Sequence, residues 1–375
     1  ILFNQTVGIL GGGQLGKMMG IVIKQMGFKL VVFDESPNSP AGQIADYEIV
    51  GSFKNKLLLK EFKKNCSVIT FEFENIPVSS IEYLMKIRAN IPQGFLPLQI
   101  AQNRFNEKSF IRKLGFKTVN FELVKNKKEL LKAIEIIQYP AIIKTCTMGY
   151  DGKGQIVLNN PTDIDKAVEL LKTQTCILEQ KISFKKECSI ICFRSINGEI
   201  TTLPVIENIH KNGILFQSIY PANIPESDLK KCKKIGLEFM KKSNCIGTIA
   251  IEFFYDNKNQ FIFNEIAPRP HNSGHLSIEA FSESQFSLHV KSILGIPFQT
   301  FNVFSPAVMT NILGQHFSNV QNNIFSKYKE NIYFHLYGKE DPQINRKMGH
   351  ITILGKNMPL LIKLGQKIID SNEKK

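Results

Sequence analysis

The chain lacks tryptophan and any long hydrophobic run. The absence of long hydrophobic runs argues against a membrane-spanning protein. Its apolar runs, such as residues 68–71, are far shorter than the ~20 residues that a membrane helix needs. The first residues, ILFNQTVGIL, show no basic segment followed by an apolar stretch and a cleavage site. We therefore expect a cytoplasmic protein that is neither exported nor bound to a membrane.

Cysteine is also sparse. The seven cysteines among 375 residues are scattered and odd in number, which does not predict a disulfide framework. Cys188 and Cys192 lie in CSIIC, where the alternation of a strand puts both on one face. They are interpreted as small core residues in a reducing compartment. The alternative is a metal site, although a second Cys/His pair at ligand spacing is missing.

The excess of positive charge raises the hypothesis of nucleic-acid binding. Lys and Arg number 47 against 33 Asp and Glu, for a net charge of +14. The lysines are spread along the chain rather than blocked, and many stand beside Asn and Ile. This pattern is typical of a proteome whose composition is biased toward Lys, Asn and Ile. The binding of phosphate-bearing substrates would account for some of the local positive charge. No nucleic-acid partner is predicted.

The length of the chain predicts two or three domains. In the first hundred residues, apolar strands at 6–10, 29–34 and 67–73 alternate with helices such as 14–26. This alternation predicts a doubly wound parallel sheet. Amphipathic helices follow at 106–114 and 127–137, and strands at 140–144, 176–180, 187–194, 201–207, 248–255 and 260–267. A helix over 282–294 precedes short strands at 307–313, 332–337 and 349–354, which indicate a small C-terminal domain.

A glycine motif, G-x-G-x-x-G at residues 11–16, stands between the first strand and the first helix, and Asp34 ends the next strand. This pattern fits a nicotinamide dinucleotide fingerprint. The same helix N-terminus could instead receive a ribose phosphate, or the motif could be a tight turn that binds nothing. The motif by itself leaves these alternatives open.

A second glycine motif, GYDGKGQ at residues 149–155, indicates nucleotide triphosphate binding. Its glycines let the backbone fold over a phosphate chain, whose charge Lys153 and Lys144 would complement. The sequence has no G-x-x-x-x-G-K-[ST], so this is not a Walker loop. The alternative is a hairpin loop with incidental charges.

Two acidic residues, Glu252 and Glu265, lie on strands joined by Asp256-Asn257-Lys258-Asn259. With a turn of two or four residues, Glu252 faces Phe263, and Glu265 is its diagonal neighbour at about 7–8 Å. Two carboxylates so placed can hold Mg²⁺ against triphosphate oxygens. A three-residue turn would break this parity, and the alternative is a pair of solvated strand acids.

Two weaker patterns point the same way. Residues 179–182 end a strand and precede Glu187. Backbone groups at the strand end could form hydrogen bonds with the edge of an adenine base, and a carboxylate could bind the two hydroxyls of a ribose. Lys339, Arg346 and Lys347 form clustered cations suited to a phosphate monoester. Alone, such a basic cluster is more often a solvated face.

Several motifs in order resemble the ATP-grasp superfamily and, within it, the 5-(carboxyamino)imidazole ribonucleotide synthase family: GILGGGQLG, TFEFENIP at 70–77, GYDGKGQ, NEIAPRPHNSGH at 264–275, YGK at 337–339 and RKMGHIT at 346–352. The resemblance covers essentially the whole chain. It implies an α/β protein with a Rossmann-like pre-ATP-grasp domain over 1–102, a two-lobed α+β ATP-grasp domain over 103–297 and a β-rich domain over 298–375. It also implies a homodimer.

The activity implied is the carboxylation of 5-aminoimidazole ribonucleotide with ATP and bicarbonate in de novo purine (IMP) biosynthesis. The reaction would run through carboxyphosphate and release ADP and phosphate; whether free CO₂ forms stays open. ATP and two Mg²⁺ ions, replaceable by Mn²⁺, are implied. A different ATP-grasp ligase, a nicotinamide oxidoreductase and a non-catalytic nucleotide-binding subunit are the alternatives.

The resemblance also assigns roles to residues by motif. The implied ATP contacts are Arg104, Lys144, Gly149, Tyr150, Asp151, Gly152, Lys153, Gly154, Gln155, Glu179, Gln180, Lys181, Ile182, Glu187, His210, Asn264 and Glu265. The implied Mg²⁺ ligands are Glu252 and Glu265. The implied ribonucleotide contacts are Gln14, Leu15, Glu74, Tyr150, Asp151, Lys339 and Arg346. Near bicarbonate and the transferring carboxyl group, the implied catalytic residues are Arg269, His271, Asn272 and Lys347, together with Tyr150.

Arg269 would offer a fork of donors to the carboxylate, and His271 is expected to accept a proton near neutral pH. The chain departs from the family pattern at Met148, where a second glycine is usual, and at Cys146, near which an Arg is common. At Lys17, which replaces an Arg, we expect a mild change on an exposed helix face.

Overall fold

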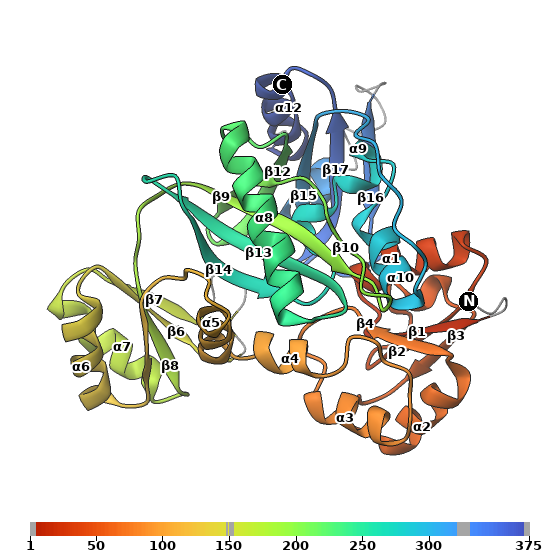
Figure 1. Ribbon diagram of the computed structural model, residues 1–375, viewed down its shortest axis with the longest axis horizontal. Helices are drawn as coiled ribbons and strands as arrows, with labels where there is room; N and C mark the ends of the chain where they lie inside the picture. The colour runs from red at the N-terminus through yellow and green to blue at the C-terminus, as the bar shows by residue number, and fades with distance from the viewer. Residues whose placement is uncertain (1–4, 148, 150–153, 321–330, 371–375) are drawn as a thin grey trace.

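The computed structural model describes residues 5–147, 149, 154–320 and 331–370 (Figure 1). Met148, Tyr150, Asp151, Gly152 and Lys153, all singled out from the sequence, lie outside the described residues. Gly149, Gly154 and Gln155 are the described members of the second glycine motif.

The N-terminal region is a parallel sheet in the order β3-β2-β1-β4, which confirms the doubly wound sheet. Its strands are rich in β-branched and aromatic residues, and side chains from both faces are buried against helices, as parallel sheets require. The elements are β1 (Thr6–Leu10), α1 (Gln14–Gln25), β2 (Lys29–Asp34), β3 (Tyr47–Val50), α2 (Lys56–Asn65), β4 (Val68–Phe71), α3 (Val78–Lys86) and α4 (Leu96–Ala101).

A small lobe follows, with a four-stranded antiparallel sheet in the order β5-β8-β6-β7. Helices α6 and α7 bury their apolar stripes against this sheet, in a core of their own. The lobe comprises β5 (Phe121–Val124), α6 (Lys127–Ile137), β6 (Ala141–Thr145), β7 (Gln155–Leu158), α7 (Ile164–Leu171) and β8 (Cys176–Gln180). Helix α5 (Arg104–Lys113) precedes it and lies between the lobe and the large sheet (Figure 1).

The large sheet has nine strands in the order β14-β13-β9-β11-β12-β15-β17-β16, with β10 paired to β9. Its strands are β9 (Phe184–Arg194), β10 (Ile200–Thr202), β11 (Ile206–Lys211), β12 (Ile214–Tyr220), β13 (Gly247–Asp256), β14 (Phe261–Ala267), β15 (Ala307–Leu313), β16 (Ile332–Leu336) and β17 (Lys347–Leu354). Because β12 pairs with β15, the strands of the C-terminal region continue the central sheet.

Helices cover both faces of the large sheet. Along β9, Cys188, Ile190 and Cys192 pack on one side with α8 (Glu226–Ser243), while Ile191 and Phe193 pack on the other with α10 (Gln285–Leu294). Successive side chains of a strand point to opposite faces, so the two cores are separated by the sheet itself. The short helix α9 (Ser277–Ala280) precedes α10, and α12 (Met358–Asp370) covers the C-terminal strands.

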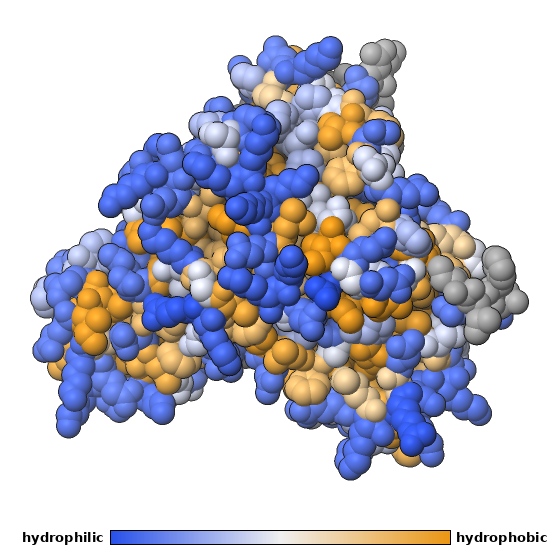
Figure 2. Space-filling model, in the orientation of Figure 1, coloured by the Kyte–Doolittle hydropathy of each residue, from blue (hydrophilic) through white to orange (hydrophobic). Residues whose placement is uncertain are grey.

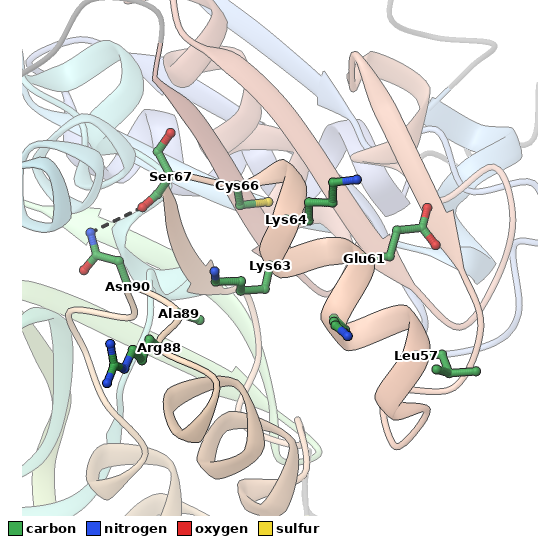
Figure 3. Close-up of a pocket in the computed structure, with 10 residues that line it drawn as sticks. Leu57, Glu61, Lys63, Lys64, Cys66, Ser67, Arg88, Ala89 and Asn90 are labelled. Atoms are coloured by element: carbon green, nitrogen blue, oxygen red, sulfur yellow. Dashed lines mark hydrogen bonds between the residues drawn. The ribbon is translucent and has the colours of Figure 1, made fainter.

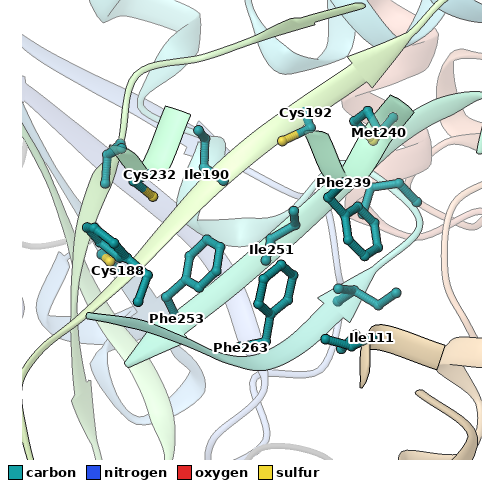
Figure 4. Close-up of a cluster of buried hydrophobic side chains, with 14 of the residues drawn as sticks. Ile111, Cys188, Ile190, Cys192, Cys232, Phe239, Met240, Ile251, Phe253 and Phe263 are labelled. Carbon is teal, nitrogen blue, oxygen red and sulfur yellow. The ribbon is translucent and has the colours of Figure 1, made fainter. Parts of the chain in front are cut away.

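The interpretation of CSIIC as core is confirmed. Cys188 and Cys192 are both fully buried in the cluster of Figure 4, and all seven cysteines are free. Across the described ranges, no group of three or more His, Cys, Asp and Glu side chains could hold a metal ion.

One prediction of secondary structure was wrong, and some elements were missed. The strand predicted over 201–207 is two strands, β10 and β11, and Pro204 lies between them, where the missing N–H cannot join a ladder. Helix α8 and strand β12 were not predicted. Along α8, Cys232, Gly236, Phe239 and Met240 keep the spacing of a buried helical face. A Cβ at Gly236 would lie 2.8 Å from Cys192 Sγ, so this glycine permits close packing on β9.

In the part of the chain that the structure describes, no helix is both long and apolar enough to cross a membrane. Figure 2 shows polar and charged side chains over most of the visible face, with the apolar ones in separate patches.

We predict that Phe239→Ala lowers the free energy of unfolding by about 3–5 kcal/mol, since it leaves a cavity in the core of Figure 4. The Phe239 ring lies 5.6 Å from that of Phe263, centroid to centroid. Urea unfolding measures the change. Phe304→Ala is the matched control, because that ring is 66% exposed and its loss should change stability by no more than about 0.5 kcal/mol. Equal losses for both variants would contradict the assignment of this core.

Candidate active site

The predicted nucleotide residues come together where the small lobe faces the edge of the large sheet. Lys144 lies on β6 and Glu179 on β8 of the lobe, while Glu252 and Glu265 lie on β13 and β14. Arg104, the first residue of α5, reaches both sides. Its guanidinium donates to Glu265 Oε2 at 3.3 Å and to the Gly149 carbonyl oxygen at 3.0 Å.

The two acidic residues predicted to bind metal are direct neighbours, but the predicted register was wrong. The turn has three residues, 257–259, so Phe253 rather than Glu252 faces Phe263. A bulge then shifts the pairing, and Glu252 lies directly opposite Glu265. Asn264 is the extra residue on β14. The bulge restores the parity that the turn breaks, and the carboxylates are closer in register than predicted.

The surroundings of Glu252 favour a cation. Burial, with the charge of Glu265 acting in the same direction, raises the pKa of its carboxyl to about 8. Two acids that oppose each other's ionisation are stabilised by a divalent ion, and hard carboxylate oxygens suit Mg²⁺. The chemistry of these two residues therefore fits a magnesium ion.

Glu179 is held between two lysines. Lys144 Nζ donates to its Oε2 at 2.7 Å, and Lys108 Nζ lies 3.4 Å from its Oε1. Burial alone would raise the pKa of Glu179, but the charges of Lys108 and Lys144 lower it to about 2. The other residues of this predicted group, Gln180, Lys181 and Ile182, follow at the end of β8, where the Lys181 N–H donates to the Pro140 carbonyl.

Glu187 and His210 form an ion pair across β9 and β11, between Glu187 Oε2 and His210 Nδ1. Burial would lower the pKa of His210, but the hydrogen bond to Glu187 and the charge of Glu252 raise it. The position of His210 beside these carboxylates therefore favours its protonated form.

The first glycine motif already has an anion at its helix. The Glu72 carboxylate accepts from the N–H groups of Gly13 and Gly16, each at 2.8 Å, and Asp34 Oδ2 accepts from Gly12 N–H at 2.6 Å. A dinucleotide phosphate would need the position that Glu72 occupies, so the geometry does not fit a nicotinamide fingerprint. Gln14 begins α1, and the Leu15 side chain is buried in the core.

The segment that carries Lys339 lies against the same helix. Lys17 Nζ donates to the Tyr337 carbonyl at 3.1 Å and Gln43 Nε2 to that of Gly338 at 2.9 Å, which docks residues 337–339 on the N-terminal sheet. Lys17 is therefore half-buried at an interface, and its expected place on an exposed helix face was wrong.

Lys339 Nζ donates to the Lys347 carbonyl at 2.9 Å, and an Arg346 nitrogen donates to the Asp341 carbonyl at 2.9 Å. Burial and the positive charge of Arg346 lower the pKa of Lys339 to about 8, although the charge of Glu72 opposes them. Two neighbouring cations of this kind are suited to a dianion.

Arg269 links the two halves of the site. Its guanidinium binds both carboxylate oxygens of Glu74, with Nη2 at 2.8 Å from Oε1. Burial would raise the pKa of Glu74, but Arg269 lowers it to about 2. Close by in the chain, the amide N and O of Asn272 are buried without a hydrogen-bond partner among the described residues. Such a group fits a small polar ligand.

His271 is placed differently from its expected role as proton acceptor. Its Nδ1 accepts from Ser273 N–H at 3.3 Å, so the proton is on Nε2, which faces Glu252 Oε1 at 3.3 Å. Burial, with the charges of Arg269 and Lys347, lowers its pKa to about 3. The geometry favours His271 as a hydrogen-bond donor that orients Glu252.

Three residues of the site were missed from the sequence: Glu72, Glu107 and Lys108. Arg104, Glu107 and Lys108 share the i, i+3, i+4 spacing of one helix face, which was the available signal.

A separate surface pocket of about 700 Å³ lies away from this site (Figure 3). It is lined by Lys60, Lys63, Lys64, Arg88 and neighbouring residues. Ser67 and Asn90 place it at the amino ends of the parallel strands, opposite the edge that carries Gly12 and Glu72. Ligands of such sheets bind at the carboxyl ends, so we do not place a substrate here.

Comparisons with known proteins agree with this geometry. Residues 4–102 match the ribonucleotide synthetase preATP-grasp domain, residues 109–286 the ATP-grasp domain, and residues 307–363 the phosphoribosylaminoimidazole carboxylase C-terminal domain. The fold and the site thus define an ATP-grasp ligase.

The N5-carboxyaminoimidazole ribonucleotide synthase of Bacillus subtilis is 41% identical over 93% of this chain and 91% of its own length. A crystal structure of an N5-carboxyaminoimidazole ribonucleotide synthetase in complex with ADP is 42% identical, with a TM-score of 0.94 over 98% of this chain and 97% of that one. The Aspergillus clavatus enzyme in complex with ADP and 5-aminoimidazole ribonucleotide is 29% identical, with a TM-score of 0.90 over 98% of both chains. This chain belongs to the N5-carboxyaminoimidazole ribonucleotide synthase family, ATP-dependent enzymes of purine biosynthesis.

The raised pKa of Glu252 predicts a pH-dependent stability. The folded, metal-free protein holds a proton that the unfolded chain releases near pH 4.5, so stability should fall as the pH rises from about 4.5 to about 8. Glu252→Gln removes the buried negative charge that forms at high pH. In the chelator-treated protein at pH 8, this variant should raise the free energy of unfolding by about 0.5–2 kcal/mol and the melting temperature by a few degrees. Thermal unfolding at several pH values measures it. An unchanged or lower melting temperature at pH 8 would contradict the arrangement of the two carboxylates.

Proposed function

We propose that the chain carboxylates 5-aminoimidazole ribonucleotide with ATP and bicarbonate, through carboxyphosphate, and releases ADP and phosphate. The main support is one continuous site, in which Glu252 and Glu265 lie between the ATP residues of the small lobe and the Glu74–Arg269 pair beside the N-terminal sheet. The Aspergillus relative, solved with ADP and 5-aminoimidazole ribonucleotide, supports the choice of substrates.

In the first step, a bicarbonate oxygen attacks the γ-phosphoryl group of ATP, and the bond from the γ-phosphorus to the β–γ bridging oxygen breaks, so that ADP leaves. Bicarbonate carbon is a poor electrophile because it carries delocalised negative charge, and phosphorylation turns a hydroxide leaving group into phosphate. Lys144 and the glycine loop at 149–155 bind the phosphates, and Arg104 links that loop to Glu265. Glu252 and Glu265 would hold Mg²⁺, or Mn²⁺ as a substitute, and the bound ion would supply positive charge to the transferring phosphoryl group. Two ions are proposed.

In the second step, the exocyclic amine of the ribonucleotide attacks the carboxyl carbon. The C–N bond forms as the C–O bond to phosphate breaks, and the amine proton leaves with the basic phosphate. Lys339 and Arg346 hold the ribonucleotide phosphate beside α1, and Gln14, Leu15 and Glu74 line its approach. Arg269, Asn272 and Lys347 bind the carboxyl group, while His271 orients Glu252. Tyr150 and Asp151 are proposed to contact the ribonucleotide as well.

The domain boundaries 1–102, 103–297 and 298–375, a homodimeric assembly and a cytoplasmic location are proposed with this function. Sedimentation at micromolar concentration tests the assembly.

The decisive measurement is phosphate release from MgATP and bicarbonate, with and without 5-aminoimidazole ribonucleotide. We expect strong dependence on the ribonucleotide, and a loss of about 10–100-fold in kcat/KM for Lys339→Ala, which removes one charge-assisted contact. Lys113→Ala, on the exposed side of α5, is the control. Release that ignores the ribonucleotide would indicate a different amine substrate, and NAD(P)H binding in its place would indicate an oxidoreductase.

The lowered pKa of Lys339 predicts an alkaline limit. The lysine is cationic below about pH 8, so kcat/KM for the ribonucleotide should fall as the pH rises through that value. Lys339→Arg keeps its charge at all accessible pH and should move the fall to higher pH. The pH profile of kcat/KM measures both. An identical alkaline limb in the arginine variant would show that another group controls it.

A further inference from the structure

Helix α5 carries two charged side chains that the proposed function does not use. Glu107 is 3% and Lys108 1% exposed, which is unusual for either residue type. They lie on the same face as Arg104, toward β14. Two adjacent, buried, ionisable side chains in the first turns of a helix require an explanation from what they contact.

Both side chains bind the backbone of β14 on either side of Glu265. Lys108 Nζ donates to the Asn264 carbonyl at 2.8 Å, and the Ile266 N–H donates to Glu107 Oε1 at 2.5 Å. Strand β14 is the last strand of its sheet, so these backbone groups point away from β13. Left without partners in the interior, each would cost about 1–3 kcal/mol.

The residue between them owes its position to the bulge. If the pairing at Phe253 and Phe263 continued regularly, Asn264 would face Glu252, and Glu265 would point to the opposite side of the sheet. The extra residue at 264 turns Glu265 to the side of Glu252. The Asn264 carbonyl that Lys108 binds belongs to the bulged residue itself.

The arrangement also reaches the small lobe. Lys108 lies 3.4 Å from Glu179 Oε1, so one ammonium group contacts both the bulge and the nucleotide strand β8. The Phe263 N–H donates to the Lys117 carbonyl beyond the end of α5, which fixes the start of the bulge on the same side.

We propose that Glu107 and Lys108 are positioning residues that hold β14 in its bulged register and so set the affinity of the Glu252–Glu265 pair for a divalent cation. The proposal rests on the proposed function, in which this pair holds the metal. Glu107 and Lys108 do not contact the metal; they act through the backbone on both sides of Glu265.

The test compares Mn²⁺ binding by electron paramagnetic resonance, in the presence of saturating ADP, across matched variants of the full chain. Glu107→Leu removes the acceptor for Ile266 N–H, whereas Glu107→Gln keeps an acceptor oxygen in the same place. We expect Glu107→Leu and Lys108→Met to weaken Mn²⁺ binding by about 10–100-fold, as loss of outer-shell support does. Glu107→Gln should restore most of the affinity, and Lys113→Met, an exposed lysine of the same helix, should match the wild type.

Amide hydrogen exchange of the metal-free protein gives an independent readout. In Glu107→Leu, the Ile266 amide should exchange faster while the amides of β13 keep their protection. Methionine has nearly the same length as lysine, so Lys108→Met should fold. This variant therefore remains informative if Glu107→Leu fails to fold.

The outcomes separate the two claims. If Glu265→Gln binds Mn²⁺ as the wild type does, the metal pair of the proposed function is wrong. If Glu265→Gln loses binding but Glu107→Leu and Lys108→Met retain it, only the positioning role is overturned. If these two variants have a lower melting temperature but an unchanged Mn²⁺ affinity, Glu107 and Lys108 contribute only to stability, and the proposal is overturned.

Discussion

The site depends on one constraint: Glu252 and Glu265 lie directly opposite each other on β13 and β14, and the Glu252 side chain is mostly buried. The strands cannot separate to lower the cost of ionising both acids, because Phe253 and Phe263 on the other face are packed into the core shared with α8. Compensation must therefore come from cations and from donors in the surroundings. Arg104 and His271 supply part of it within the chain, and a divalent ion would supply the rest.

Much of the fold could be predicted from local patterns. Residues 127–137 form a helix, and 176–180 and 307–313 form strands, with the predicted bounds, because their apolar periodicity is clear. Helix α8 was missed among neighbouring strands, since its apolar positions are interrupted by pairs of lysines. The register of β13 and β14 could not be predicted, because it depends on turn length. Asn259 adopts the left-handed conformation that a three-residue turn requires, and the bulge corrects the result.

The candidate site divides in the same way. Lys144, Glu179 and Arg269 could be singled out from the sequence. The role of Glu72, which lies within the motif at 70–77, could not be predicted, because it arises from contacts with Gly13 and Gly16, more than fifty residues away. The G-x-G-x-x-G pattern is thus a weak guide to its ligand. In other proteins the N-terminus of this helix binds a dinucleotide phosphate. Here it binds the side chain of Glu72, which fixes the glycine loop and contributes to the electrostatic surroundings of Lys339.

The two lysines on Glu179 have different freedom, and this difference bears on how the lobes act together. Lys144 is at the end of a strand of the small lobe, where phosphate oxygens would compete with Glu179 for its charge. Lys108 is fixed, since it also binds the Asn264 carbonyl of the large sheet. Glu179 would otherwise become an unpaired buried charge when Lys144 turned to a phosphate, a change that costs several kcal/mol. With Lys108 in place, Glu179 keeps one cationic partner when Lys144 turns to a phosphate. Strand β8 of the small lobe then remains joined, through Lys108, to strand β14 of the large sheet.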